Sequence, residues 1–227
     1  MENKVLIRPA TVDDSAGLAR VQVDSYRTAY AAIWSQELLD RFTYEEQERD
    51  WQEWHASRPD DLIFVADASG TSQVVGYALT RPGPTEIAPY DSELLALHVH
   101  PTRYRQGIGR RLVAAAARQL KRQGCASMML WTMKENDAHG FYRRLGAQLL
   151  DAGKISGTGA VEVAYGWPVL ENLIQAASAD TDDHQQATNK DLLQAINAAY
   201  DEPPTPEEMV CRQAMREKQK RLVKGEW

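Results

Sequence analysis

A glycine-punctuated turn between a strand and a long helix is the feature that most constrains this chain. Residues 94–101 are LLALHVHP, an apolar run of strand length that ends at a proline. Residues 102–112 follow as TRYRQGIGRRL, with no acidic residue at the start of the expected helix. Amides at a helix N-terminus bind anions, and glycine lets a pyrophosphate approach the backbone closely. The segment from Gln106 to Arg110 therefore predicts a site for a phosphorylated cofactor.

Two common phosphate-binding loops do not fit this turn. The P-loop requires a lysine and a serine or threonine after its last glycine, and the dinucleotide fingerprint requires a third glycine. Here Gly109 is followed by Arg110, Arg111 and Leu112. The spacing strand-Pro-x(5)-Gly-x-Gly-x-x-Leu resembles instead the coenzyme A signature of the GNAT N-acetyltransferases.

A second motif strengthens the resemblance. Residues 136–147 are NDAHGFYRRLGA and follow the apolar run MMLWTM at 128–133. This order predicts a strand, an Asn-capped helix, a glycine stop and another strand. The pattern Asn-x-x-Ala/Gly-x-x-Phe-Tyr-x-x-Leu-Gly is similar to the GNAT motif downstream of the glycine turn. The resemblance implies an α+β fold: a mixed, mostly antiparallel sheet with splayed central strands, flanked by helices.

Hydrophobic periodicity and turn residues predict a compatible order of elements. Strands are expected at residues 5–10, 62–66, 74–80, 93–100, 126–133, 147–155 and 160–165. Helices are expected from Thr11 onward and over 35–57, 107–122, 137–145 and 168–177. Three prolines between residues 81 and 91 exclude a central strand there.

The C-terminal part differs in character from the rest. We expect an acetyltransferase domain at 1–174, a flexible linker at 175–188 and a helical C-terminal extension at 189–227. The linker is polar and acidic, whereas the extension carries apolar residues at helical spacing. Two short amphipathic helices cannot form a core alone. The extension is expected to dock on the catalytic domain, on a second subunit of a homodimer or on a protein partner.

Composition and charge weigh against several classes of partner. The formal net charge of −6 argues against a nucleic-acid partner held by phosphate contacts. No apolar run is long enough to span a membrane, and the N-terminal residues predict a strand rather than a signal peptide, so a cytoplasmic location is expected. The cysteines at positions 125 and 211 suggest neither a disulfide framework nor a metal site.

The resemblance also implies a reaction and a set of cofactor contacts. GNAT enzymes transfer an acetyl group from acetyl-CoA, a co-substrate, directly to an amine, without a metal. One departure concerns Tyr104, which stands where the family usually has Arg or Gln. The residues expected to bind the cofactor are Leu97, Val99, Arg105, Gln106, Gly107, Gly109, Arg110 and Asn136. For Asn136, helix capping alone is an alternative role.

Two catalytic residues are implied. Tyr142 occupies the family's position for the general acid that protonates the coenzyme A sulfur, and a phenol is protonated at neutral pH. Its alternative role is a core aromatic. Glu93 stands where several GNAT enzymes keep a carboxylate that removes the amine proton; its alternative is a solvated charge at a strand end. His98 and His100 are expected to serve packing or surface roles.

The acceptor is the least constrained part of the prediction. Family members wall this site with the first two helices, and here Tyr26 and Tyr30 are expected to bind the substrate. Aromatic rings with nearby carboxylates suit a small ammonium-bearing molecule, so a small-molecule primary amine is expected. The alternatives are a protein, peptide or aminoacyl-tRNA N-acetyltransferase, and a non-catalytic acyl-CoA-binding module whose C-terminal helices recruit a partner.

Overall fold

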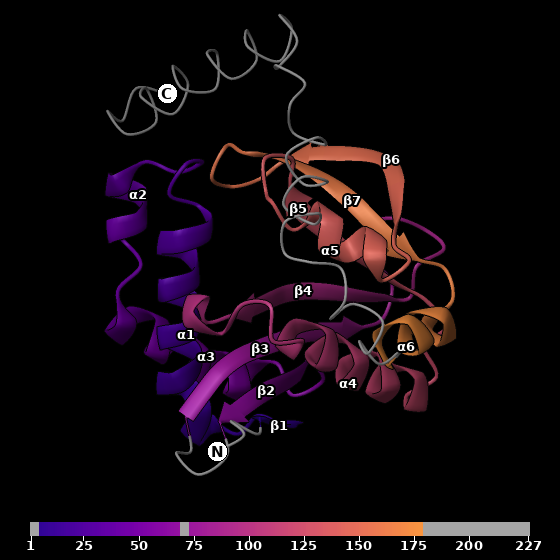
Figure 1. Cartoon of the computed structure of the whole chain (residues 1–227), viewed down its shortest axis with the longest axis horizontal. Coiled ribbons are helices and arrows are strands. Elements are labelled where there is room, and N and C mark those ends of the chain that lie inside the picture. The colour runs from indigo at the N-terminus through magenta and orange to yellow at the C-terminus, as the bar shows by residue number, and fades with distance from the viewer. Residues whose placement is uncertain (1–4, 69–72, 179–227) are drawn as a thin grey trace, which may run out of the picture. The chain divides into compact units, whose positions relative to one another are not determined.

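A seven-stranded mixed sheet with strand order β1-β2-β3-β4-β5-β7-β6 forms the centre of the fold. The computed structural model describes residues 5–68 and 73–178 (Figure 1). The strands are β1 (Val5–Pro9), β2 (Leu62–Ala68), β3 (Gln73–Pro82), β4 (Ser92–Val99), β5 (Met128–Met133), β6 (Gln148–Ile155) and β7 (Val161–Trp167). The helices are α1 (Ser15–Ala29), α2 (Gln36–Asp40), α3 (Tyr44–Ser57), α4 (Ile108–Arg122), α5 (His139–Arg144) and α6 (Leu170–Ser178). The expected fold class is confirmed.

Helices cover both faces of the sheet, because neighbouring strand residues point to opposite sides. On β3, Leu79 packs in a cluster with Leu18 of α1 and Trp51 of α3. Its neighbour Ala78 packs in a second cluster with Leu112 of α4 and with α6. The glycine turn and the N-terminal helices therefore lie on opposite faces.

One expected helix is divided in two. The single helix expected over 35–57 is wrong, because α2 ends at Asp40 and α3 begins at Tyr44. The Thr43 hydroxyl accepts a hydrogen bond from the Glu46 amide, 3.2 Å away, and so caps a new helix.

The expected domain division falls mostly outside the described residues. α6 continues to Ser178, so residues 175–178 of the expected linker are helical. The remainder of that linker and the extension at 189–227 are not described. The division, and a homodimer or partner contact through the extension, stay predictions.

The sheet opens between β4 and β5, its parallel pair. The two strands are paired at a single position, Glu93 opposite Met129. Just beyond it, β4 bulges: Thr80 of β3 pairs with Leu94 and Leu79 pairs with Ala96, which leaves Leu95 without a partner. A bulge bends its strand and increases the local twist. The bulge therefore explains why β4 leaves β5 at this point.

A hydrogen-bonded clamp holds the two strands together before they part. The Asp91 carboxylate accepts hydrogen bonds from the amides of Ala126 (2.8 Å) and Ser127 (2.9 Å), and from the Ser127 hydroxyl (2.9 Å). The Ser92 hydroxyl donates to the Ser127 carbonyl oxygen at 2.6 Å. We call Asp91, Ser92 and Ser127 the strand clamp.

Among the described helices, none combines the length and the apolar character that crossing a bilayer requires.

The hydrogen bonds of the strand clamp predict that the unfolding free energy depends on the charge of Asp91. Burial raises the pKa of Asp91, but the hydrogen bonds from Ala126 and Ser127 outweigh burial and leave that pKa below its usual value. The stabilisation from a depressed pKa is present above the unfolded value of about 3.9 and is lost as pH falls through the folded pKa. Asp91→Ala should lower the unfolding free energy by about 2–3 kcal/mol at pH 7.

Urea unfolding at pH 7 and at lower pH measures the effect. The difference from wild type should shrink as the medium is made more acidic than the unfolded pKa of about 3.9. Asp60→Ala, at an exposed loop position, is the control and should change little. A deficit for Asp91→Ala that is independent of pH would contradict the role of the charged carboxylate.

Candidate active site

The glycine turn is a strained backbone loop at the start of α4. Gly107 is the N-cap residue of α4 and adopts a left-handed conformation, with φ of +72°. Arg105 has φ of +64° and is the one non-glycine residue with positive φ in the described part of the chain. This conformation costs a non-glycine residue about 1 kcal/mol, and such strain is concentrated at functional sites.

Gly109 joins the turn to the two other motif elements. A Cβ built on Gly109 would lie 3.5 Å from the Phe141 ring of α5 and 3.7 Å from Val99 of β4. A methyl group fits at these distances, whereas a larger side chain fills the space between the strand and α5. The first turn of α4 carries no acidic residue, so its amides keep a positive field. These features suit the pyrophosphate of coenzyme A.

The outer edge of β4 can bind an amide-bearing ligand. The His100 amide donates to the Val75 carbonyl oxygen of β3 at 2.9 Å. Because an antiparallel ladder alternates, the backbone groups of Leu97 and Val99 then point away from β3. They face β5, with which β4 shares no pair beyond Glu93 in the described residues. The Val99 carbonyl oxygen also accepts a hydrogen bond from the Ser25 hydroxyl at 3.2 Å.

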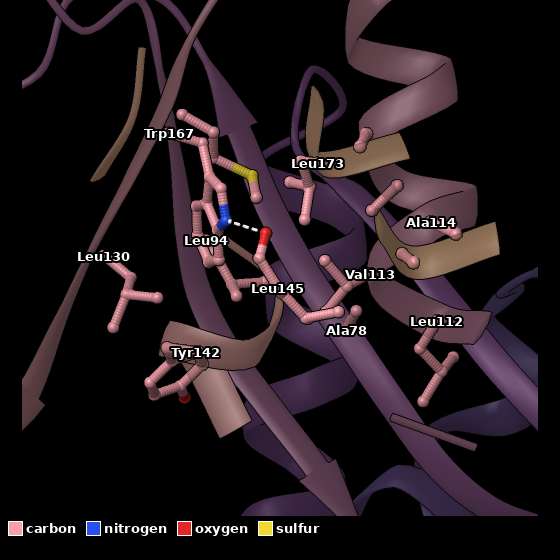
Figure 2. Packing of buried hydrophobic residues seen from close by; sticks show 14 of the residues in the cluster. Ala78, Leu94, Leu112, Val113, Ala114, Leu130, Tyr142, Leu145, Trp167 and Leu173 are labelled. Carbon is pink, nitrogen blue, oxygen red and sulfur yellow. Dashed lines mark hydrogen bonds between the residues drawn. The ribbon is translucent and has the colours of Figure 1, made fainter. Parts of the chain in front are cut away.

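Tyr142 of α5 is buried among aromatic side chains. The residue is 8% exposed, and its ring centroid lies 5.5 Å from that of Phe141 and 6.3 Å from that of Trp167. The Trp167 indole donates to the Leu145 carbonyl oxygen at 2.8 Å, which ties the end of α5 to β7 (Figure 2). In the same view the Tyr142 hydroxyl points away from that bond.

Burial sets the protonation state of Tyr142. Desolvation of the phenolate raises the pKa of Tyr142 to about 12. The hydroxyl is therefore protonated at neutral pH and able to donate a proton.

Asn136 holds the turn between β5 and α5. Its side-chain oxygen accepts a hydrogen bond from the Ala138 amide at 3.0 Å, and its amide donates to the Thr132 hydroxyl at 3.2 Å. The helix begins at His139, so Asn136 closes a turn before the helix instead of capping it directly. These hydrogen bonds give Asn136 a structural role in the turn. Its expected contact with the cofactor stays a prediction.

The N-terminal helices bring an aromatic cluster to β4. The Tyr26 ring centroid lies 5.2 Å from that of Tyr30, and 5.3 Å from that of His98 on β4. Burial raises the pKa of Tyr30, and the charges of Tyr26, Tyr142, Glu162 and Tyr104 raise it further. Burial is the largest cause, so the Tyr30 hydroxyl is protonated at neutral pH.

His98 of β4 and His100, which directly follows the strand, differ in environment. Burial lowers the pKa of His98 to about 4, so its imidazole is neutral at pH 7. His100 contacts the Thr102 hydroxyl at 2.8 Å and the Asp24 carboxylate at 3.1 Å, which links α1 to the glycine turn. His98 is thus buried among neighbouring side chains, and His100 makes two polar contacts; the packing or surface roles expected for them stay predictions.

Glu93 lies among charged residues on the face covered by the N-terminal helices. Burial raises the pKa of Glu93; Lys154 and Arg81 lower it, while Glu86 and Glu162 raise it. A carboxylate with a raised pKa is a stronger base than an exposed glutamate. The strand-end position expected for Glu93 is therefore also a partly desolvated one.

Three residues near Glu93 were missed in the sequence. Lys154, Trp131 and Glu162 come from β6, β5 and β7, and the Lys154 ammonium lies 4.3 Å from the Trp131 ring centroid. The sequence did offer one indication that Glu162 is functional, because it is the one charged residue in the strand segment VEVAYGW at 161–167.

No group of three or more His, Cys, Asp or Glu residues that could hold a metal ion occurs in residues 5–68 and 73–178.

Comparisons with known proteins agree with this geometry. Residues 24–147 match the model of the acetyltransferase (GNAT) family. The uncharacterized N-acetyltransferase YuaI of Bacillus subtilis (strain 168) is 36% identical over 172 residues, which cover 74% of this chain and 96% of that protein. A spermidine N(1)-acetyltransferase of Thermoplasma acidophilum is 26% identical over 64% of this chain and 89% of its own.

Solved structures share the fold. The PaiA N-acetyltransferase of Thermoplasma acidophilum in complex with coenzyme A superposes with a TM-score of 0.56 at 22% identity, covering 72% of this chain and 99% of that one. YncA of Salmonella typhimurium, a putative acetyltransferase with its cofactor acetyl-CoA, gives a TM-score of 0.53 at 22% identity, covering 73% and 94%. With the family match, the relatives and the strained glycine turn in agreement, the chain belongs to the GNAT acetyltransferase family and is an acetyl-CoA-dependent N-acetyltransferase.

Proposed function

We propose that this enzyme acetylates a small-molecule primary amine. The observation that carries the proposal is the position of Tyr142 and Glu93 around the opening between β4 and β5. Leu94 packs in the same cluster as Tyr142, so its neighbour Glu93 points to the opposite face. An acid and a base then approach one reacting centre from two sides. The similarity to a spermidine N(1)-acetyltransferase supports a small amine as acceptor.

The proposed contacts run along the coenzyme A molecule from its pantetheine arm to its pyrophosphate. The backbone groups of Leu97 and Val99 pair with the pantetheine amides. Amides of the glycine turn bind the pyrophosphate, and basic side chains add charge. The residues proposed to bind the pyrophosphate are Arg105, Gln106, Gly107, Gly109 and Arg110. Asn136 is proposed to contact the cofactor from the turn that follows β5.

The proposed chemistry divides between the two faces. Acetyl-CoA supplies a thioester whose acetyl group passes to the amine nitrogen. Glu93 takes a proton from the incoming ammonium, directly or through water, because a neutral amine is required for attack. Tyr142 gives its proton to the leaving sulfur and is reprotonated, directly or through water, by the second proton that the acetylated nitrogen releases, while Glu93 returns the first proton to solvent. Tyr26 and Tyr30 line the acceptor side with aromatic rings.

A screen of acceptors tests the substrate class. Release of coenzyme A should be measured with alkylamines, polyamines, amino acids, aminoglycosides, peptides and aminoacyl-tRNA at equal concentration. The proposal expects the highest kcat/KM among the small primary amines. Turnover confined to peptides or to aminoacyl-tRNA would overturn it.

Tyr142→Phe tests the proton donor. Loss of a general acid should lower kcat by about 10² to 10⁴ while the Kd for coenzyme A stays within about twofold. Tyr165→Phe is the matched control, since that buried hydroxyl accepts from Arg143 at 3.3 Å and has no proposed catalytic role. Equal kcat in wild type and Tyr142→Phe, with chemistry rate-limiting, would reassign Tyr142 to packing.

Gly109→Leu tests the cofactor turn. The leucine side chain would fill the space between Val99 and Phe141, so the Kd for coenzyme A should rise at least about tenfold, or 1.4 kcal/mol. Calorimetric titration of folded protein measures the change. Gly157→Leu is the control, because a Cβ there meets nothing within 4 Å. Unchanged affinity in a folded Gly109→Leu protein would contradict the proposed turn.

A further inference from the structure

An ammonium group already lies on the acceptor side of the sheet. The Lys154 Nζ atom is 4.3 Å from the centroid of the Trp131 ring and donates a hydrogen bond to the Glu86 carboxylate at 2.8 Å. The Trp131 indole nitrogen is buried and has no hydrogen-bond partner among the described residues. The indole thus contacts a cation through its face rather than through its N–H group.

Strand alternation places this ammonium on the same face as Glu93. Leu130 and Val163 pack in the cluster beneath α4, so their neighbours Trp131 and Glu162 point to the other face. On β6, Ala152 packs against the Met129 cluster on that face, and Lys154 follows it two residues later. We call Glu86, Glu93, Trp131 and Glu162 the cation site.

Lys154 is the dominant charge acting in the cation site. Burial raises the pKa of Glu93 and of Glu162, and in each case Lys154 is the strongest of the neighbouring charges, lowering the pKa. The Lys154 side chain retains 36% of its exposure, so the ammonium is not locked in the interior. An exposed ion pair of this kind is weak and can be exchanged for another cation.

We propose that the Lys154 ammonium occupies the place of the acceptor's own ammonium and is displaced when the acceptor binds. This inference rests on the proposed function and names the class of acceptor more closely. The incoming group is a protonated alkylamine whose ammonium contacts Trp131 and whose proton passes to Glu93. The three carboxylates on this face repel a further carboxylate, so amino acids are poor acceptors.

An internal competitor lowers the apparent affinity for the acceptor. Lys154→Met keeps the length and apolar stem of the side chain but removes the competing charge. The KM for n-butylamine should fall about tenfold, with kcat within about twofold. Lys154→Arg keeps a cation over Trp131 and should leave the KM near that of wild type. The KM for 4-aminobutyrate should exceed that for n-butylamine in every variant.

Lys121→Met is the matched control. Lys121 is also ion-paired with a glutamate, Glu171, but it lies on α4, away from the cation site. Its KM and kcat should equal those of wild type. An unchanged or raised KM in Lys154→Met would overturn the inference, because a side chain that only supports the fold cannot improve affinity when it is removed.

A binding measurement separates this inference from the proposed function. Lysines can be converted to ¹³C-dimethyllysines, with the Lys154 signal assigned by its loss in Lys154→Arg. Ring current from Trp131 should shift that signal, and n-butylamine without acetyl-CoA should return it to the position of an exposed lysine. Displacement without acetylation of any amine would refute the proposed function alone. Acetylation of n-butylamine with an unmoved Lys154 signal would refute the displacement alone.

Discussion

The strand clamp fixes the point at which β4 and β5 separate, where the candidate active site lies. Asp91 and Ser92 bind the segment that leads into β5, so β4 and β5 meet at Glu93 and Met129 and at no later pair within the described residues. The bulge at Leu95 then turns β4 from its neighbour while pairing with β3 continues. A continuous sheet would satisfy the backbone groups of Leu97 and Val99 internally. The interrupted pair leaves the backbone groups of Leu97 and the amide of Val99 for a ligand, while the Val99 carbonyl oxygen already accepts from Ser25.

The two faces of this opening have opposite electrostatic character. On one face the N-terminus of α4 directs amides outward, with Arg105 and Arg110 in or beside the turn. On the other face Glu93 and Glu162 are partly desolvated carboxylates. Under the proposed function, an anionic cofactor and a cationic acceptor are attracted to different sides of one sheet. Their reacting groups can meet only where β4 and β5 separate.

Local patterns predicted the parts of the site that one segment forms by itself. The glycine turn and the position of Tyr142 follow from contiguous motifs, and both occupy the expected elements. Arg105 gave no sign of its left-handed backbone, because arginine rarely adopts it. The proximity of Lys154 to Trp131 depends on the register of β5, β7 and β6, which no local pattern specifies. The break before Thr43 was missed because apolar periodicity outweighed a capping threonine.

Amide hydrogen exchange along β4, measured by NMR with and without coenzyme A, tests the central claim most directly. The His98 and His100 amides face β3 and should be protected in both states. The amides of Leu97 and Val99 face β5 and should exchange rapidly in the free enzyme and slowly in the complex. Leu97 and Val99 amides that are already protected without coenzyme A, or that stay unprotected in its presence, would contradict a cofactor site formed by the interrupted pair.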